Sequence, residues 1–223
     1  MAWGGSWQPV AKRLRAQGHR AVTLTLPGLN DGDDPSTRRL GDAVDHIVRE
    51  VRRLPSDNVV LVAHSWGGYP ATGAVPLLAG RVRKIVYLNA QIPIRGRSLV
   101  DDDPPELRMH NLRLIAESPT GSIPATLEDV QRAFMQGVAP ELQRLVADLL
   151  TPQPGHYFTD ALDIDAATLG IPVAYLASEC DRALQWPAAE FAARLNVPPI
   201  PVPGTHNAML THPDAIAEAI LAA

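Results

Sequence analysis

The stretch Asn58-Val59-Val60-Leu61-Val62-Ala63-His64-Ser65-Trp66-Gly67-Gly68 decides the fold of this chain. An apolar, β-branched run ends at a serine, and a helix-like segment begins after two glycines. This order of strand, cramped turn and helix is typical of a nucleophile elbow, whose strained turn requires small neighbours around the serine. Gly67 and Gly68 meet that requirement, and Ala63 stands where the commonest form of the motif has glycine. The alternative is a buried strand followed by an ordinary glycine-rich turn.

Length and composition favour one soluble globular domain. The 223 residues are 46% hydrophobic and 20% charged, which is ordinary for a chain with one sizeable core. The net charge of −4 provides no basic surface for nucleic acid and no polybasic membrane anchor. Cys180 is the only cysteine, so a reducing compartment is compatible. The segment Met1–Trp7 lacks the charged leader and apolar core of a signal peptide.

No stretch approaches the roughly 18 consecutive apolar residues of a membrane-spanning helix. We therefore expect a cytoplasmic protein that binds neither nucleic acid nor membranes. The sequence leaves its oligomeric state open.

Short β-branched runs alternate with longer amphipathic segments, which is typical of a parallel sheet covered by helices in an α/β protein. The predicted strands are Ala21–Leu26, Val59–Ala63, Lys84–Leu88, Val173–Ala177 and Pro199–Val202. The predicted helices are Pro9–Gln17, Leu40–Leu54, Tyr69–Leu78, Pro187–Leu195 and Pro213–Leu221.

The alternation stops between about residues 90 and 170, where acidic and proline-rich loops precede helical segments such as Leu127–Met135 and Glu141–Leu150. We interpret residues 91–169 as an inserted helical cap over the carboxyl ends of the strands, and residues 1–90 with 170–223 as the core. The cap is expected to set specificity, although its apolar side chains are also suited to packing the cap onto the core. The pocket candidates are Trp3, Gln91, Leu114, Phe134, Met135 and Leu149.

A serine nucleophile needs an adjacent base, usually a histidine held by a third group. Of the seven histidines, His206 fits best, because it follows the last predicted strand and so lies at the sheet edge where Ser65 emerges. His64 is next to Ser65, but neighbouring residues on a strand point to opposite faces. The alternative for His206 is a packed loop histidine without a catalytic role.

The orienting acid should follow the penultimate predicted strand. Asp181 is the choice there and Glu179 is its rival, while the alternative for Asp181 is a capping aspartate in a turn. After the strand Lys84–Leu88 the chain offers Asn89 instead of an acid. The order serine, acid, histidine is that of one fold among the triad enzymes.

Acyl transfer also requires hydrogen-bond donors for the developing oxyanion. The backbone N–H of Trp66, directly after the serine, is one candidate. Ala2 in the loop Met1–Trp7 is the other, and the alternative for that loop is a disordered N-terminal tail.

These residues resemble the α/β-hydrolase superfamily over nearly the whole chain, and more narrowly its branch of methyl-ester esterases and hydroxynitrile lyases. Ala2–Trp7 is similar to the oxyanion loop of that branch, Leu26–Leu29 to the turn after its next strand, and Gly204–Leu210 with Pro213 to its histidine loop. The resemblance implies Ser65 as nucleophile, His206 as base and Asp181 as its partner.

Two departures from the branch matter. The strand that precedes the oxyanion loop in the family has no counterpart in the printed sequence, so we expect the natural chain to begin further upstream. Without that strand, unpaired backbone and an apolar groove are expected beside Val59–Ala63. Lyases of the branch carry a lysine after the histidine and a threonine in the oxyanion loop, where this chain has Asn207 and Met1.

The sequence therefore predicts a serine hydrolase of a small carboxylic ester or related acyl compound, which requires no metal or organic cofactor. The alternatives are a lyase of the hydroxynitrile type, an acyl-transfer enzyme, and a non-catalytic receptor for small ligands with a hydrolase fold.

Overall fold

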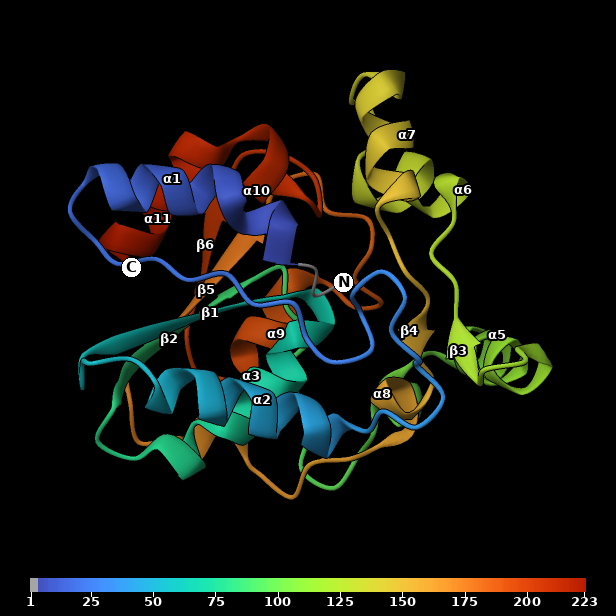
Figure 1. The fold of residues 1–223 in the computed structure, drawn as a ribbon, viewed down its shortest axis with the longest axis horizontal. Coiled ribbons are helices and arrows are strands. Elements are labelled where there is room, and N and C mark those ends of the chain that lie inside the picture. Colours follow the sequence, from blue (N-terminus) through green and yellow to red (C-terminus); the bar gives the residue numbers. More distant parts are fainter. Residues whose placement is uncertain (1–3) are drawn as a thin grey trace.

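A four-stranded parallel sheet runs through the computed structural model, which describes residues 4–223 (Figure 1). The strands are β1 Val59–His64, β2 Val82–Leu88, β5 Val173–Ser178 and β6 Pro199–Val202, in the order β1-β2-β5-β6. His64 pairs with Leu88, and Leu88 pairs with Leu176. These strands confirm four of the predicted ones, and their shared direction puts all four carboxyl ends at one edge.

Helices cover both faces of the sheet because side chains alternate along the strands. In β2, Ile85 and Tyr87 pack into the core cluster of α2, α3 and α9, whereas Val86 and Leu88 pack into the cluster of α1, α10 and α11. The bounds are α1 Gln8–Ala16, α2 Leu40–Arg52, α3 Gly68–Ala74, α9 Ala188–Ala193, α10 Ala208–Thr211 and α11 Pro213–Ala222. The predicted α/β class, a mostly parallel sheet flanked by helices, is confirmed.

The predicted helix Tyr69–Leu78 is interrupted. The helix α3 ends at Ala74, and a separate 3₁₀ turn spans Pro76–Leu78. Pro76 lacks a backbone N–H and cannot donate the next hydrogen bond of an α-helix, although Val75 before it keeps helical dihedrals. The apolar spacing used for the prediction does not report this missing donor.

The predicted strand Ala21–Leu26 is wrong, because this segment pairs with no strand among residues 4–223. Side chains hold it instead: Gln8 Nε2 donates to Thr23 Oγ1 at 2.8 Å, and the backbone N–H of Gly4 donates to Thr25 Oγ1 at 3.1 Å. Its apolar residues were recognised correctly, but a strand also needs a neighbour about 4.8 Å away.

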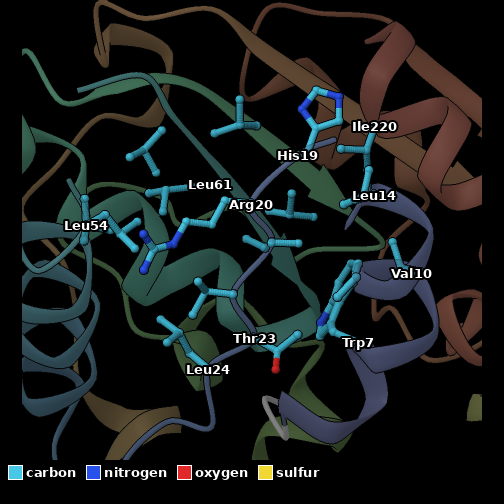
Figure 2. Close-up of a pocket in the computed structure, with 18 of the residues that line it drawn as sticks. Trp7, Val10, Leu14, His19, Arg20, Thr23, Leu24, Leu54, Leu61 and Ile220 are labelled. Carbon is cyan, nitrogen blue, oxygen red and sulfur yellow. The ribbon is translucent and has the colours of Figure 1, made fainter. Parts of the chain in front are cut away.

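An apolar cavity of about 680 Å³ separates this segment from β1 (Figure 2). Leu61 of β1 lies on one side of the cavity and Leu24 on another, and helices α1 and α11 contribute Val10, Leu14 and Ile220. The expected groove beside the elbow strand is thus present. It also explains why residues 21–26 form no ladder with β1.

Most of the predicted cap, residues 91–169, lies to one side of the sheet (Figure 1). Its helices are α4 Leu99–Asp102, α5 Pro105–Glu117, α6 Leu127–Asp129, α7 Pro140–Asp148 and α8 His156–Thr159. The predicted helix Leu127–Met135 continues from α6 as a π-helical turn, Val130–Phe134. A short antiparallel pair, β3 Ser122–Ile123 and β4 Gln153–Pro154, was not predicted, because two residues are too few to show a period.

The boundaries at residues 91 and 169 stay a prediction. Within residues 4–223, no helix is both long and apolar enough to cross a membrane.

Candidate active site

Ser65 stands at the tip of a strained turn after β1. Its φ is +54°, a left-handed conformation that is uncommon for residues other than glycine. Two backbone hydrogen bonds hold the turn: the Ser65 N–H donates to the Asn89 carbonyl at 3.2 Å, and the Ser65 carbonyl accepts from the Gln91 N–H at 3.0 Å. The nucleophile elbow that the sequence predicts is therefore present as a backbone feature.

The two glycines after Ser65 differ in their surroundings. A Cβ atom on Gly68 would lie 2.1 Å from the carbonyl oxygen of Gln91. A Cβ atom on Gly67 would meet no atom within 4 Å among the described residues. The demand for a small residue thus falls on Gly68, where the start of α3 passes close to the chain after β2.

Ser65, His206 and Asp181 form one hydrogen-bonded row. His206 Nε2 lies 2.9 Å from Ser65 Oγ, and His206 Nδ1 lies 2.8 Å from Asp181 Oδ2. The exposed fraction is 2% for the histidine side chain and 6% for the aspartate side chain. The rival acid Glu179 is exposed to solvent. The structure thus brings together the three residues chosen from the sequence, each from the end of a different strand.

Asp181 is held in its charged form. Burial raises the pKa of its carboxyl group. The interaction with His206 and hydrogen bonds from the backbone N–H groups of Ala183 and Leu184 lower the pKa by more than burial raises it, so the net pKa lies below the ordinary value. The Ala183 N–H donates to Asp181 Oδ1 at 2.7 Å. An ionised carboxylate at this place can orient a histidine and stabilise its protonated ring.

His64 is closer to the site than strand alternation implied. Its ring centroid lies 4.5 Å from that of His206, and His64 Nε2 lies 2.9 Å from the His206 carbonyl oxygen. Ser65 follows β1 and has a left-handed backbone, so strand alternation does not continue through it. His64 contacts both the ring and the backbone carbonyl of His206.

Trp66 connects the elbow to the cap. Its buried indole ring stacks on the Tyr157 ring of α8 with centroids 4.1 Å apart, and Nε1 donates to the Tyr157 carbonyl at 2.6 Å. The backbone of Trp66 belongs to the 3₁₀ turn Ser65–Gly67. Ala2 and Trp3, the other oxyanion donor and a pocket residue proposed from the sequence, lie outside the described residues.

Two of the pocket candidates, Phe134 and Gln91, contact the residues around Ser65 and His206, and the other described candidates show no such contact. The Phe134 ring centroid lies 5.6 Å from that of His206. The Gln91 N–H donates to the Ser65 carbonyl, and its Nε2 donates to Gln185 Oε1 at 2.9 Å. Met135 is fully buried within the apolar cluster of the cap, and Leu149 is 43% exposed. Leu114 is half-buried on α5 and belongs to none of the apolar clusters of the described residues.

The sequence analysis missed hydrogen bonds between residues 134–136 and the loops that carry Asp181 and His206. The Phe134 carbonyl accepts from Thr205 Oγ1 at 2.9 Å and from the Asn207 N–H at 3.1 Å. Gln136 Nε2 donates to the Cys180 carbonyl. The cap therefore contacts the loops on both sides of the histidine–aspartate pair. Backbone carbonyl groups accept all three hydrogen bonds, and every residue has such a group, so the identity of the accepting residue could not predict them.

Comparisons with known proteins agree with this architecture. A family model described as the alpha/beta hydrolase family matches residues 2–219. A carbendazim-hydrolysing esterase from Nocardioides sp. (strain SG-4G) is 31% identical over 151 residues, which are 66% of this chain and 61% of that protein. Methylesterase 18 from Arabidopsis thaliana is 28% identical over 192 residues, which are 78% of this chain and 73% of that protein.

One solved structure is similar over the whole chain. It is an extracellular alpha/beta-hydrolase from a Paenibacillus species, described as sharing structural and functional homology with tobacco salicylic acid binding protein 2. The TM-score is 0.90 at 22% identity, over 100% of this chain and 94% of that one. At this identity the likeness shows the fold alone. The family model establishes that the chain belongs to the α/β-hydrolase family.

Proposed function

We propose that this protein is a serine hydrolase that cleaves a small carboxylic ester or a related acyl compound. The observation that carries the proposal is the row from Ser65 Oγ through the His206 ring to Asp181, with atom separations of 2.9 and 2.8 Å. The names of the relatives, which are esterases and methylesterases, support ester hydrolysis as the reaction class.

In the proposed first half-reaction, Ser65 Oγ attacks the ester carbonyl carbon while its proton passes to His206 Nε2. The ionised Asp181 holds Nδ1–H and stabilises the imidazolium ring. The tetrahedral intermediate then expels the alcohol oxygen, which takes the proton from Nε2. The acyl group is left on Ser65 Oγ.

In the second half-reaction, water attacks the acyl carbon and gives a proton to His206 Nε2. Collapse of the second intermediate returns that proton to Ser65 Oγ and releases the carboxylic acid. The negative oxygen of each intermediate requires aligned donors, for which we propose the backbone N–H groups of Trp66 and Ala2. These steps balance with water as the only co-substrate and need no metal or organic cofactor.

We also propose that residues 91–169 act as a cap that shapes the substrate pocket. Phe134 of the cap lies 5.6 Å from the His206 ring, measured between centroids. Gln91, where the cap begins, contacts the elbow through its backbone and Gln185 through its side chain. The pocket proposal therefore rests chiefly on Phe134 and Gln91.

The decisive experiment replaces the nucleophile. Ser65→Ala should lower the rate of p-nitrophenyl ester hydrolysis by about 10⁴-fold or more and abolish labelling by a fluorophosphonate probe. The exposed Ser56, just before β1, provides the matched control, and Ser56→Ala should keep both properties. Full hydrolysis in Ser65→Ala would overturn the proposal. Labelling of Ser65 without turnover across a panel of esters would instead direct attention to cyanohydrin cleavage, acyl transfer to an alcohol, or ligand binding.

A further inference from the structure

We infer that Asn89 is a positioning residue for the proposed reaction, which sets the separation between Ser65 and His206. Asn89 follows β2, at the sheet edge where Ser65, Asp181 and His206 follow the other three strands. It is completely buried and has a φ of +46°. The inference rests on the proposed function.

The backbone of Asn89 holds the nucleophile side of the site. Its carbonyl accepts the 3.2 Å hydrogen bond from the Ser65 N–H, and its own N–H donates to the Leu176 carbonyl at 3.0 Å. Ser65 and Asn89 both have left-handed backbones and face each other where β1 and β2 end. The strained turn of the nucleophile is thus supported by a second strained residue.

The side chain of Asn89 holds the histidine side. Its Nδ2 group donates to the His206 carbonyl at 3.0 Å and to Ser178 Oγ at 2.8 Å, with the Thr205 carbonyl at 3.4 Å. Its Oδ1 atom accepts from the Ser178 N–H at 2.7 Å. Ser178 ends β5, from which the loop carrying Asp181 begins.

Only an amide satisfies this set of partners. Oδ1 faces an N–H group and must accept, whereas Nδ2 faces carbonyl oxygens and must donate, so the orientation of the amide is fixed by chemistry. A carboxylate would place an acceptor against the carbonyls of Thr205 and His206. Asparagine also tolerates the left-handed backbone better than most residues. One residue therefore meets the conformational demand and both hydrogen-bonding demands.

The test deletes the amide while leaving the backbone unstrained. Asn89→Gly keeps the left-handed conformation at little conformational penalty, so the loss is confined to the side-chain contacts. Active sites are titrated with the fluorophosphonate probe, and kcat is expressed per titrated site. We expect a fall of about 10- to 100-fold in kcat per site, since a misplacement of about 1 Å has effects of this size. KM should change by less than threefold.

Asn196 provides the matched control, because it is exposed and also has a left-handed backbone, with a φ of +56°. Asn196→Gly should leave kcat per site within twofold. A merely structural role for Asn89 would reduce the number of titratable sites and leave kcat per site unchanged, which would overturn the inference. If Asn89→Gly does not fold, Asn89→Asp decides by the same criterion.

The same experiment distinguishes a failure of the proposed function from a failure of the role inferred for Asn89. Wild-type protein that the probe does not label would refute the serine mechanism, and the positioning role with it. Labelled wild-type protein with an unaffected Asn89→Gly variant would refute only the role of Asn89.

Discussion

The carboxyl edge of the sheet and the predicted cap, residues 91–169, differ in how they are held together. At the sheet edge, His206, Asp181 and Asn89 each contact fixed partners on neighbouring strands or loops. In the cap, α5 has no buried residue, and the apolar cluster has only three buried members, Val130, Met135 and Val146. The proposed chemistry therefore falls on the part of the described chain whose polar groups have cross-strand partners.

Two carboxyl groups show the same contrast. The pKa of Asp181 is held below its ordinary value although burial opposes this, because His206 and backbone N–H groups favour the charge. Burial raises the pKa of Asp103, between α4 and α5, to about 6, and the charge of Asp102 adds to the rise while the hydrogen bond from Asn111 opposes it. Partners at the sheet edge thus offset the burial of Asp181, whereas the hydrogen bond from Asn111 does not offset the burial of Asp103.

Of the substitutions that test this comparison, Asp181→Asn is expected to have the largest effect, because it removes that charge. An amide can donate to His206 Nδ1 and favour the wrong tautomer of the ring, so kcat for ester hydrolysis should fall by about 10³- to 10⁴-fold. Glu179→Gln removes the exposed rival carboxylate and should leave kcat within twofold. Steady-state kinetics on both variants checks this, and more than a tenth of wild-type kcat in Asp181→Asn would contradict the assignment.

A smaller effect is expected from Phe134→Ala in the cap. The substitution removes the ring near His206 but leaves the carbonyl that accepts from Thr205 and Asn207. KM for an ester with an apolar acyl group should rise about tenfold, as for a lost apolar pocket contact, with kcat within threefold. Leu149→Ala, at an exposed cap position, serves as the control. A fall in kcat with KM unchanged would show that the ring positions His206 and does not bind substrate.

The smallest expected effect is a change in the folding stability of the Asp103→Asn variant. Because the pKa of folded Asp103 is about 6 and that of an unfolded aspartate is about 3.9, the folded state binds more protons between these values, and stability falls as the pH rises through this window. Asp103→Asn should therefore be more stable than the wild type by about 1 kcal/mol at pH 8 and show no gain near pH 3.5. Thermal unfolding at both pH values measures this.

Asp101→Asn supplies the control of opposite sign. The Ser98 hydroxyl group donates to the Asp101 carboxylate and lowers its pKa, so this variant should lose stability at pH 8. An equal gain in stability for both variants would trace the effect to net charge and not to burial of Asp103.

The sheet and the residues of the hydrogen-bonded row were predictable from the sequence because both depend on side-chain type. Apolar β-branched runs identified β1, β2, β5 and β6, and the residues after three of them identified Ser65, Asp181 and His206. The run Ala21–Leu26 carried the same signal, yet strand pairing depends on a neighbour that no local pattern reports. The role inferred for Asn89 lay equally out of reach, since its partners are mostly backbone groups brought together by the fold.

The difference between Gly67 and Gly68 has a consequence for engineering this active site. Gly67 has a φ of −54°, and a Cβ atom added to it would meet no atom within 4 Å among the described residues, so a library randomised at this codon samples new side chains next to Ser65. At codon 68 every other amino acid meets the Gln91 carbonyl and displaces the segment that hydrogen-bonds the Ser65 backbone. Adjacent codons of the same motif thus divide into one open to diversification and one to be held constant.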